Sequence, residues 1–453
     1  MLTLLLLSIP FFSLSSNTPI SLNVKTFGAK GDGSTDDTDA FASALHNLAD
    51  EGGGILTVPS GTYLVADLQV GSNTTIRGVG VPRPILLKRQ DGNAILDLYG
   101  GIAQGTRLPL HNITIDSLIL RGRSLGFGFK EHIHNLIAIG VNKLVIHDVA
   151  FVAFQGDGVY LGSRLHPSEP ALHNSDVIIS NNQFSGTNAQ NRNGISVTDC
   201  SRCILEHNWF SDITRPNMPG AIDIEPNSED EIIRDISVRY NTVTGTNGTA
   251  ALSVALLGQS QREPFGHLVI EGNLVEHANL GIVISTRQRG IGPTQDLSLE
   301  VRNNIVRAVV QPLKIDNLSG EITIADNQFS TSPAGVEARR IYGSGINFTG
   351  NHLLRVGTES LGAILAGTLS SVDFEDNIFV DVGASQKRGS AIYFISGADK
   401  IRLLKNTFSS PHHITRVAVG AASPIQFAGD AITWSGNTLN DNIQPGALVS
   451  VPH

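Results

Sequence analysis

The chain has 453 residues and a formal net charge of −9, from 32 Lys and Arg against 41 Asp and Glu. This acidic balance argues against a nucleic-acid partner, but it leaves room for a locally basic cleft that binds an acidic ligand. Glycine is abundant, at 47 residues, and only 16 % of the residues are charged, as expected for stacked strands joined by tight turns. A chain of this length can hold two or three ordinary domains.

Residues 1–15 begin with an apolar run and end in small residues. The run is too short to span a bilayer, and the pattern predicts a secretory signal peptide, although no Lys or Arg precedes the run. The alternative is a hydrophobic N-terminal strand. No other segment has the pattern of a transmembrane helix, so we expect a secreted protein, extracellular or periplasmic, without a membrane partner.

A short helix is predicted over residues 36–49, with Thr35 or Asp36 as its capping residue. Its apolar stripe consists of Phe41, Ala44, Leu45 and Leu48. The Asp-rich residues 31–37 just before it look like a calcium or phosphate loop. We favour turn and cap chemistry instead, because carboxylates are favourable at a helix N-terminus.

One pattern then recurs down the chain, apolar-x-apolar-x-x-Asn-x-apolar. Two early copies, at residues 113–120 and 144–151, keep the apolar frame without the asparagine. The successive copies are 23 to 33 residues apart, which is the period of a solenoid. The repeated asparagines are Asn182, Asn208, Asn241, Asn273, Asn304, Asn327, Asn351, Asn377, Asn406 and Asn437.

Each copy shows period-2 alternation, so it is predicted to be a strand. Leucine-rich repeats would continue into a helix, whereas here a second short strand follows, as in Gly158–Leu161 and Ala221–Ile224. The sequence therefore predicts an all-β fold, a single-stranded parallel β-helix of about a dozen coils over residues 23–453, with the short N-terminal helix as its cap. We expect the repeated asparagines to take the left-handed bend of a turn and to stack their amides along the axis, as scaffold residues.

Two N-terminal stretches carry a family resemblance. They are Phe27-Gly-Ala-Lys-Gly-Asp-Gly-x-Thr-Asp-Asp-Thr38 and Gly-Gly-Gly-x-x-x-Val-Pro-x-Gly-Thr-Tyr63. Residues 23–65, the predicted cap and first coils, thus resemble the pectate-lyase-like domain of rhamnogalacturonases, alginate epimerases and many phage tailspikes. The resemblance implies a right-handed parallel β-helix and a polysaccharide ligand, and the spike relatives leave a trimer open. It does not determine the reaction, because this fold hosts lyases, hydrolases, epimerases and non-catalytic adhesins.

The two cysteines, Cys200 and Cys203, form one C-x-x-C pair. Two cysteines cannot supply a four-ligand zinc site. We expect buried thiols, because a local disulfide would need a turn between positions i and i+3 of an extended strand.

Aligning the second strands on their inward apolar residues predicts outward residues that stack in columns from coil to coil. Long insertions, at residues 162–176, 212–220, 226–235, 257–267 and 286–296, are expected to flank this face and form a cleft. One column reads Ala138, Tyr160, Ser196, Asp223, Ser253, Val283 and Lys314, the next Gly140, Gly162, Thr198, Glu225, Ala255, Ser285 and Asp316, and a third His134, Gly156, Arg192 and Pro219.

Asp223 and Glu225 are the strongest candidate pair of catalytic groups. Two residues apart on one strand, they share a face with Cα atoms about 6.6 Å apart. Inverting glycosidases hold their carboxylates about 6.5–9.5 Å apart and retaining ones about 5–5.5 Å, and side-chain rotamers can place this pair in either range. The alternatives are a solvated strand face and a structural cation site.

Arg192 lies one coil from that pair, and a guanidinium suits a uronate carboxylate or a developing enolate. Residues 192–198 also resemble the Arg-His-Gly-Phe-x-Val strand of alginate epimerases, which implies an active-site role for Arg192. Asp157-Gly158 is similar to the catalytic Asn-Thr-Asp-Gly of polygalacturonases, although Gln155-Gly156 departs from that motif and the other polygalacturonase motifs are missing. A turn arginine and a turn aspartate are the alternatives.

Tyr160 and His134 are candidate proton carriers. Tyrosines donate protons in some lyases, and Tyr160 is equally suited to stack on a sugar. Residues 127–132 are similar to the Tyr-Gly-Phe-Asp-Pro-His segment of alginate epimerases, with Phe127 and Lys130 in place of Tyr and Asp, which puts an epimerase mechanism in doubt. His132 and His134 remain candidate bases, with a structural role as the alternative.

A basic cluster is expected to bind an anionic polysaccharide. Arg262, Arg287 and Arg289 lie on two neighbouring loops, and Lys314 continues the column of Asp223. The alternative is a set of solvated loops.

The sequence favours a secreted enzyme that cleaves a uronate-containing polysaccharide. The Asp223–Glu225 pair favours hydrolysis over elimination, with C5 epimerisation third and a non-catalytic glycan-binding adhesin as the alternative of another class. No cofactor is required, although a lyase could use either Arg192 or a calcium ion to neutralise the uronate carboxylate. No metal ligands are assigned.

Overall fold

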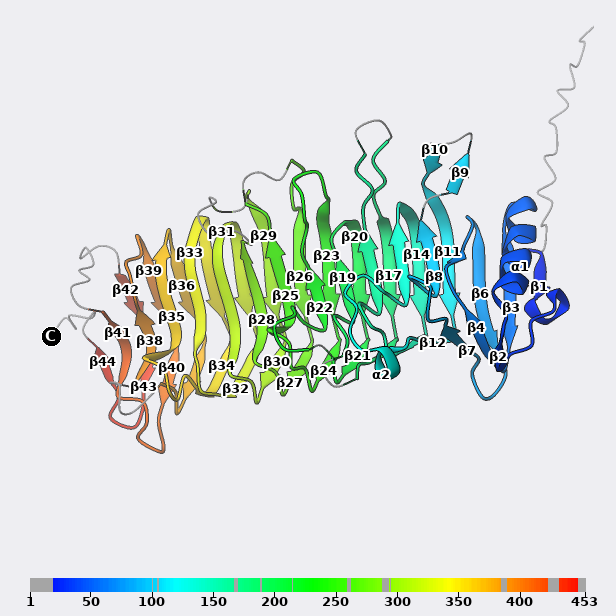
Figure 1. Cartoon of the computed structure of the whole chain (residues 1–453). Helices are drawn as coiled ribbons and strands as arrows, with labels where there is room; N and C mark the ends of the chain where they lie inside the picture. The colour runs from blue at the N-terminus through cyan, green and yellow to red at the C-terminus, as the bar shows by residue number, and fades with distance from the viewer. Residues whose placement is uncertain are drawn as a thin grey trace, which may run out of the picture.

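The computed structural model describes residues 19–99, 101–103, 106–166, 170–187, 190–213, 215–258, 262–286, 293, 295–383, 389–422 and 432–446. The predicted signal peptide lies outside these residues, as do Arg287 and Arg289. The described chain is an elongated parallel β-helix whose strands stack coil on coil (Figure 1), so the predicted fold class is confirmed.

Three parallel ladders run along the solenoid, two of them joined into a sheet of 27 strands and the third a sheet of 15. Ladder one contains β5 (Leu68–Gln69), β8 (Leu96–Tyr99), β13 (Leu136–Ile139), β16 (Val159–Gly162), β19 (Ile195–Val197), β22 (Ile222–Ile224), β25 (Ala250–Leu256), β28 (Leu280–Thr286), β35 (Gly362–Leu369), β38 (Ser390–Phe394), β41 (Val417–Ala421) and β44 (Gln444–Gly446). The long strands β31 (Gln311–Ala325) and β33 (Val336–Thr349) run through both ladder one and ladder two.

Ladder two contains β1 (Ser21–Asn23), β3 (Gly54–Pro59), β6 (Thr74–Val79), β11 (Leu110–Asp116), β14 (Val141–His147), β17 (Ser175–Ser180), β20 (Cys200–Glu206), β23 (Ile233–Arg239), β26 (His267–Glu271), β29 (Leu297–Arg302), β36 (Val372–Glu375), β39 (Ile401–Leu404) and β42 (Ile432–Ser435). A small antiparallel hairpin, β9 (Gly101–Ala103) and β10 (Thr106–Leu108), precedes β11 in the chain and projects from the solenoid (Figure 1).

Ladder three contains β2 (Asp32–Asp36), β4 (Thr62–Val65), β7 (Ile85–Lys88), β12 (Ile119–Arg121), β15 (Ala150–Val152), β18 (Gln183–Ser185), β21 (Trp209–Ser211), β24 (Thr242–Thr244), β27 (Leu274–Glu276), β30 (Ile305–Arg307), β32 (Gln328–Ser332), β34 (His352–Val356), β37 (Ile378–Val380), β40 (Thr407–Ser409) and β43 (Thr438–Leu439). Its 15 strands are slightly more than the dozen coils predicted.

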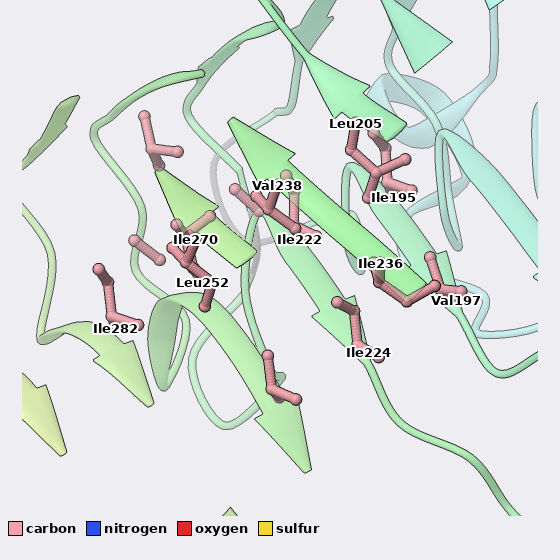
Figure 2. Close-up of a cluster of buried hydrophobic side chains, with 14 of the residues drawn as sticks. Ile195, Val197, Leu205, Ile222, Ile224, Ile236, Val238, Leu252, Ile270 and Ile282 are labelled. Carbon is pink, nitrogen blue, oxygen red and sulfur yellow. The ribbon is translucent and has the colours of Figure 1, made fainter. Parts of the chain in front are cut away.

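The interior of the solenoid is a continuous apolar core. Ile222 and Ile224 of β22 point inward with their counterparts from neighbouring strands (Figure 2). Complete burial of an aliphatic side chain of this size contributes about 1.5–3 kcal/mol. Along ladder three, Phe151, Phe184 and Phe210 stack with ring centroids 4.7 Å apart. This inward set leaves the alternate residues of each strand facing outward.

The repeated asparagines form one buried hydrogen-bonded row between ladders two and three. Asn241 Nδ2 donates to Asn273 Oδ1 at 3.0 Å, and its backbone N–H donates to the same oxygen at 2.9 Å. The amide row was therefore predicted correctly, but the backbone role was not. The left-handed bend belongs to the preceding residue, as at Tyr240 (φ 54°) and Gly272 (φ 64°), because the asparagine itself must point its amide inward.

Helix α1 (Thr38–Asp50) lies at the N-terminal end of the solenoid (Figure 1). Its buried residues are those of the predicted stripe, Phe41, Ala44, Leu45 and Leu48. Of the two predicted capping residues, Asp36 lies just outside the N-cap position, and its Oδ1 accepts the backbone N–H of Thr38, the first residue of the helix, at 3.1 Å. The N-cap is Asp37, which forms no side-chain capping bond, because its carboxylate accepts the backbone N–H groups of Lys30 and Gly31. The role of α1 as a lid on the solenoid stays a prediction.

Cys200 and Cys203 are joined by a disulfide at the start of β20, so the expectation of free thiols was wrong. Arg202 between them has a φ of 56°, and this bend brings the two Cα atoms within 6.3 Å, a separation that a disulfide can bridge.

Two further short helices are η1 (Val24–Phe27) and α2 (Ser124–Phe127). In the part of the chain that the structure describes, no helix combines the length and the apolar character needed to cross a bilayer.

Candidate functional site

The outward face of ladder one places three polar residues in a row on successive coils. The register pairs Tyr160 of β16 with Ser196 of β19, and Ser196 with Asp223 of β22. Neighbouring strands lie about 4.8 Å apart, so Tyr160 and Asp223 are about two strand spacings apart. One member in each of the first two predicted columns was wrong, because the register pairs Ile137 with Tyr160 and Ile139 with Gly162. The predicted Ala138 is instead fully buried and pairs with Leu161, and Gly140 follows the last paired residue.

Arg192, just before β19, lies at the centre of this row. Its Nη1 donates to Asp157 Oδ2 at 3.1 Å and to Ser196 Oγ at 3.1 Å. Its Nη2 lies 3.8 Å from Asp223 Oδ2, and its Nε lies 3.8 Å from Glu131 Oε1; both distances exceed a hydrogen bond. The Nε atom is buried and has no hydrogen-bond partner among the described residues.

Asp157 is fully buried and holds the cluster together from one side. Its Oδ1 accepts the backbone N–H of Asn193 at 3.0 Å. His134 Nδ1 lies 3.2 Å from Oδ2 and 3.0 Å from the backbone nitrogen of the same aspartate. Burial alone would raise the pKa of Asp157, but the hydrogen bond from His134 and the charge of Arg192 outweigh it and hold this pKa below its usual range.

Asp223 lies on the other side of Arg192 in a contrasting environment. It is 2 % exposed, and burial together with the negative charge of Glu225 raises its pKa to about 8. Arg192 and the hydroxyl of Ser253 oppose this rise only in part. Asn193 Nδ2 donates to Asp223 Oδ2 at 3.2 Å, whereas Oδ1 is buried without a hydrogen-bond partner.

Glu225 follows β22 and is less buried than Asp223. Its backbone N–H donates to Val197 O at 2.9 Å, which continues the parallel register by one residue. Asp223 and Glu225 therefore leave the same face of one extended segment, as the alternation of a strand requires.

Tyr160 is packed in a fixed orientation beside this cluster. Its ring stacks on His134 with centroids 5.0 Å apart and planes 15° apart. A Cβ atom on Gly162 would come within 2.4 Å of the ring, so the absence of a side chain there lets the ring lie over the strand end. The Tyr160 Oη lies 3.4 Å from Thr198 Oγ1.

Loops from non-adjacent coils meet on both sides of the row. On one side, the Arg215 guanidinium lies 4.3 Å above the Phe129 ring. On the other side, Ser163 Oγ donates to Glu231 Oε1 at 3.0 Å. The first contact joins loops that precede strands of ladder one, and the second joins loops that follow them.

The basic cluster predicted to bind substrate lies at different places. Arg262 is paired with Glu229 and Asp230, at 2.8 Å and 2.7 Å, on the rim of a cavity of about 470 Å³ that is also lined by His173. Lys314 continues the column of Asp223 through Ser253 and Val283, as predicted, and its Nζ lies 3.8 Å from Glu337 Oε1. Arg287 and Arg289 lie outside the described residues.

The geometry thus brings together His134, Asp157, Tyr160, Arg192 and Asp223 and places Arg262 and Lys314 apart from them. Sequence reasoning missed Asn193 and Glu231. Asn193 follows Arg192 directly, which is a usable signal, whereas Glu231 reaches the site only through the fold of its loop. Within the described ranges, no three His, Cys, Asp or Glu side chains are arranged to hold a metal ion.

Residues 21–259 match the family described as "Rhamnogalacturonase A/epimerase, pectate lyase-like". Alginate lyase 7 of Azotobacter vinelandii is 44 % identical over 78 residues, which are 16 % of this chain and 9 % of that protein. The chain spans no more than 45 % of the length of the first three curated relatives.

Solved structures share the fold at low identity. The N-terminal fragment of gene product 12 of bacteriophage Phi29 has a TM-score of 0.65 and 17 % identity, covering 93 % of this chain and 72 % of that chain. The A-module of the mannuronan C-5 epimerase AlgE6 of Azotobacter vinelandii has a TM-score of 0.57 and 17 % identity, covering 92 % and 99 %. Since the family match covers more than half of the 453 residues, the chain belongs to the pectate-lyase-like rhamnogalacturonase A/epimerase family.

Proposed function

We propose that this chain is a polysaccharide-active enzyme that cleaves a uronate-containing glycan by hydrolysis, at the site that contains Asp157, Arg192, Asp223 and Glu225. The observation that carries the proposal is the position of Arg192 between two aspartates whose pKa values are shifted in opposite directions. Environments that separate the pKa values of neighbouring carboxyl groups are a mark of acid–base sites. The alginate lyase among the relatives supports a uronate substrate, since alginate is a chain of uronates.

Arg192 is suited to bind the carboxylate of a uronate. A side-on, bidentate contact uses the Nε and Nη2 hydrogens of a guanidinium. In Arg192, Nε has no hydrogen-bond partner among the described residues, and Nη2 lies 3.8 Å from Asp223 Oδ2. Asp157 holds Nη1 from behind, so the guanidinium is oriented before the substrate arrives. A substrate carboxylate here would place the adjoining glycosidic bond near Asp223.

Asp223 is suited to donate a proton to the glycosidic oxygen. With a pKa raised to about 8 it is protonated at neutral pH. Its Oδ2 accepts from Asn193, which leaves the proton on Oδ1, the atom without a partner. As the bond to the leaving sugar breaks, this proton passes to the departing oxygen.

Glu225 then serves as base or nucleophile. The two Cα atoms are about 6.6 Å apart along the strand, and the side-chain rotamers decide whether the carboxyl groups take the wider spacing that admits an attacking water or the closer spacing for direct attack by Glu225. In the first case, Glu225 removes a proton from the water that attacks the sugar carbon. Asp157 is enclosed by Arg192, His134 and Asn193 and has a positioning role.

Elimination is the second candidate, favoured by the contact of Tyr160 with His134 beside Arg192. There, Arg192 would neutralise the uronate carboxylate while Tyr160 or His134 moved the proton from the carbon beside it. Both reactions use the same carboxylate contact.

The test is incubation of the purified protein with pectin, alginate and glycosaminoglycan chains. New reducing ends without ultraviolet absorbance from an unsaturated uronate support hydrolysis, and reducing ends with that absorbance favour elimination. A changed uronate composition at unchanged chain length would indicate C5 epimerisation. Glycan binding without any change of the chain, unaffected by Asp223→Asn, would reject catalysis in favour of an adhesin.

A further inference from the structure

A chain of three side chains leads from the polar row to the loop that precedes β23. Tyr160 Oη lies 3.4 Å from Thr198 Oγ1, and Thr198 Oγ1 donates to Glu231 Oε1 at 3.2 Å. Tyr160, Thr198 and Glu231 come from β16, from the end of β19 and from the loop that precedes β23. No sequence pattern joins them.

Glu231 is a fixed acceptor at the inner end of this chain. It is 6 % exposed, and its Oε1 also accepts from Ser163 Oγ at 3.0 Å. Its Oε2 accepts the backbone N–H groups of Asn227 and Ser228. A carboxylate held by several donors has one rotamer and one hydrogen-bond role.

The direction of the chain follows from the proton count. Burial raises the pKa of Glu231, and the hydrogen bonds from Asn227, Ser163 and Ser228 oppose this rise. In its ionised form the carboxylate can only accept, so the single hydroxyl proton of Thr198 is directed at Glu231. The alternative acceptor, Leu161 O at 3.4 Å, is a weaker partner than a carboxylate at 3.2 Å. Thr198 then offers only lone pairs to Tyr160, so the phenol proton points at Thr198 and away from the row that holds Ser196 and Asp223.

We propose that Glu231 is a positioning residue that acts through Thr198 to present the phenol oxygen of Tyr160 as a hydrogen-bond acceptor for a sugar hydroxyl. This inference rests on the proposed function for its ligand, a glycan with a free hydroxyl at the unit beside the cleaved bond. The ring is already fixed by His134 and by the space over Gly162, so only the hydroxyl proton remains to be oriented. An acceptor oriented in this way favours a hydroxyl and disfavours an acetyl or methyl ether at the same position.

The first experiment compares Thr198→Val with Thr198→Ser. Valine keeps the shape of threonine and removes the hydroxyl, whereas serine keeps the hydroxyl. We expect Thr198→Val to weaken binding of a uronate oligosaccharide, measured calorimetrically in the Asp223→Asn background, by about fivefold to tenfold, the effect of one hydrogen bond. Thr198→Ser should bind like the parent. Equal affinities of the two variants would overturn the proposal.

The second experiment needs no ligand and no activity. Burial raises the pKa of the Tyr160 phenol, the hydrogen bond with Thr198 opposes this rise, and the charge of Glu231 adds to it. In Glu231→Gln the charge is lost and the amide NH₂ can donate to Thr198, which turns the threonine proton toward the phenol. We therefore expect the phenol to titrate at lower pH, measured by ultraviolet difference titration with Tyr160→Phe as the blank. Ser163→Ala, which removes another donor to Glu231, should leave the phenol titration unchanged.

The two experiments separate this proposal from the proposed function. A lowered phenol pKa in Glu231→Gln together with no glycan binding by the parent would support the Tyr160–Thr198–Glu231 chain and reject the proposed ligand. An unchanged phenol pKa would overturn the chain even if the protein proves to be a hydrolase. If Glu231→Gln does not fold, the Thr198 pair decides alone.

Discussion

Two stretches of ladder one use the same residue types in opposite ways. Around β31 and β33, Arg340 grips Asp316 with both Nε and Nη2, at 2.8 Å and 2.5 Å. Around β19 and β22, Arg192 holds Asp157 through Nη1 alone and leaves Nε without a partner. An arginine that uses its bidentate edge on a neighbouring coil is a structural tie, whereas one that keeps this edge free is prepared for another carboxylate.

The position of the acidic partner explains the difference. Asp316 sits directly opposite Arg339 in the register and next to Arg340, so the pair closes between adjacent coils. Asp157 and Asp223 lie on coils on either side of Arg192, and neither faces its Nε–Nη2 edge at hydrogen-bond distance. The polar row of the N-terminal stretch is therefore left incomplete, and the C-terminal stretch is not.

The strongest way to break this comparison is to neutralise one aspartate in each stretch. Asp223→Asn should lower kcat by about 100-fold to 10,000-fold, the range for loss of a general acid, because the amide cannot release a proton to the leaving oxygen. Asp316→Asn should leave kcat unchanged. Activity would be followed by reducing-end release on the glycan that the panel identifies, and equal activities of the two variants would remove the basis for the proposed site.

The buried row of asparagines, in which the side chains are hydrogen-bonded to one another, shows how much such a row contributes to the free energy of unfolding. Asn273→Ala should lower the free energy of unfolding by about 3 kcal/mol, because it leaves several buried partners without hydrogen bonds, among them Asn241 N and Nδ2. Asn437→Ala, at the half-buried end of the row, should cost about 1 kcal/mol. Urea unfolding of both variants measures the difference, and equal losses would mean that the row does not stabilise the interior coils cooperatively.

A smaller effect is expected from conservative changes of the two arginines. Arg192→Lys should weaken affinity for a uronate oligosaccharide about tenfold, since an ammonium cannot make the bidentate contact. Its effect on a neutral glycan should be slight. Arg340→Lys should not alter glycan affinity and should lower the melting temperature instead. Calorimetry in the Asp223→Asn background measures both affinities. A weaker affinity of Arg340→Lys than of Arg192→Lys would contradict the comparison.

The fold could be predicted from the sequence because its signals are local and repeated. Alternating apolar residues and one asparagine per coil determine which side chains face inward, and the same frame carries the register from coil to coil. The predicted columns of outward residues were therefore mostly correct. The two errors, Ala138 for Ile137 and Gly140 for Ile139, are one shift of a single residue in the coil of β13.

The site could be predicted only in part, because its contacts depend on loops. Arg192, Asp157 and Asp223 were found since they stand at fixed offsets from inward residues. Glu231 was missed, because its approach to Thr198 depends on the path of residues 225–232. The Cys200–Cys203 disulfide was missed for a similar reason, since no pattern in the sequence predicts the left-handed backbone bend at Arg202.

The pH dependence of stability gives the most selective test of the comparison, because it reports on one carboxyl group. Asp223 has a folded-state pKa of about 8, whereas an unfolded aspartate titrates near about 3.9. Between these values the folded state binds the extra proton, so the free energy of unfolding falls as the pH rises through this window. Asp223→Asn removes this contribution.

We therefore expect the melting temperature of the parent to fall relative to that of Asp223→Asn as the pH rises from about 4 to about 8. Asp316→Asn is the control, because its carboxylate is already paired with Arg340 and should not reproduce the effect. If the melting temperatures of the parent and of Asp223→Asn changed with pH by the same amount over this range, Asp223 would be ionised in the folded protein. In that case it could not be the proton donor, and the N-terminal stretch would differ from the C-terminal one in geometry but not in chemistry.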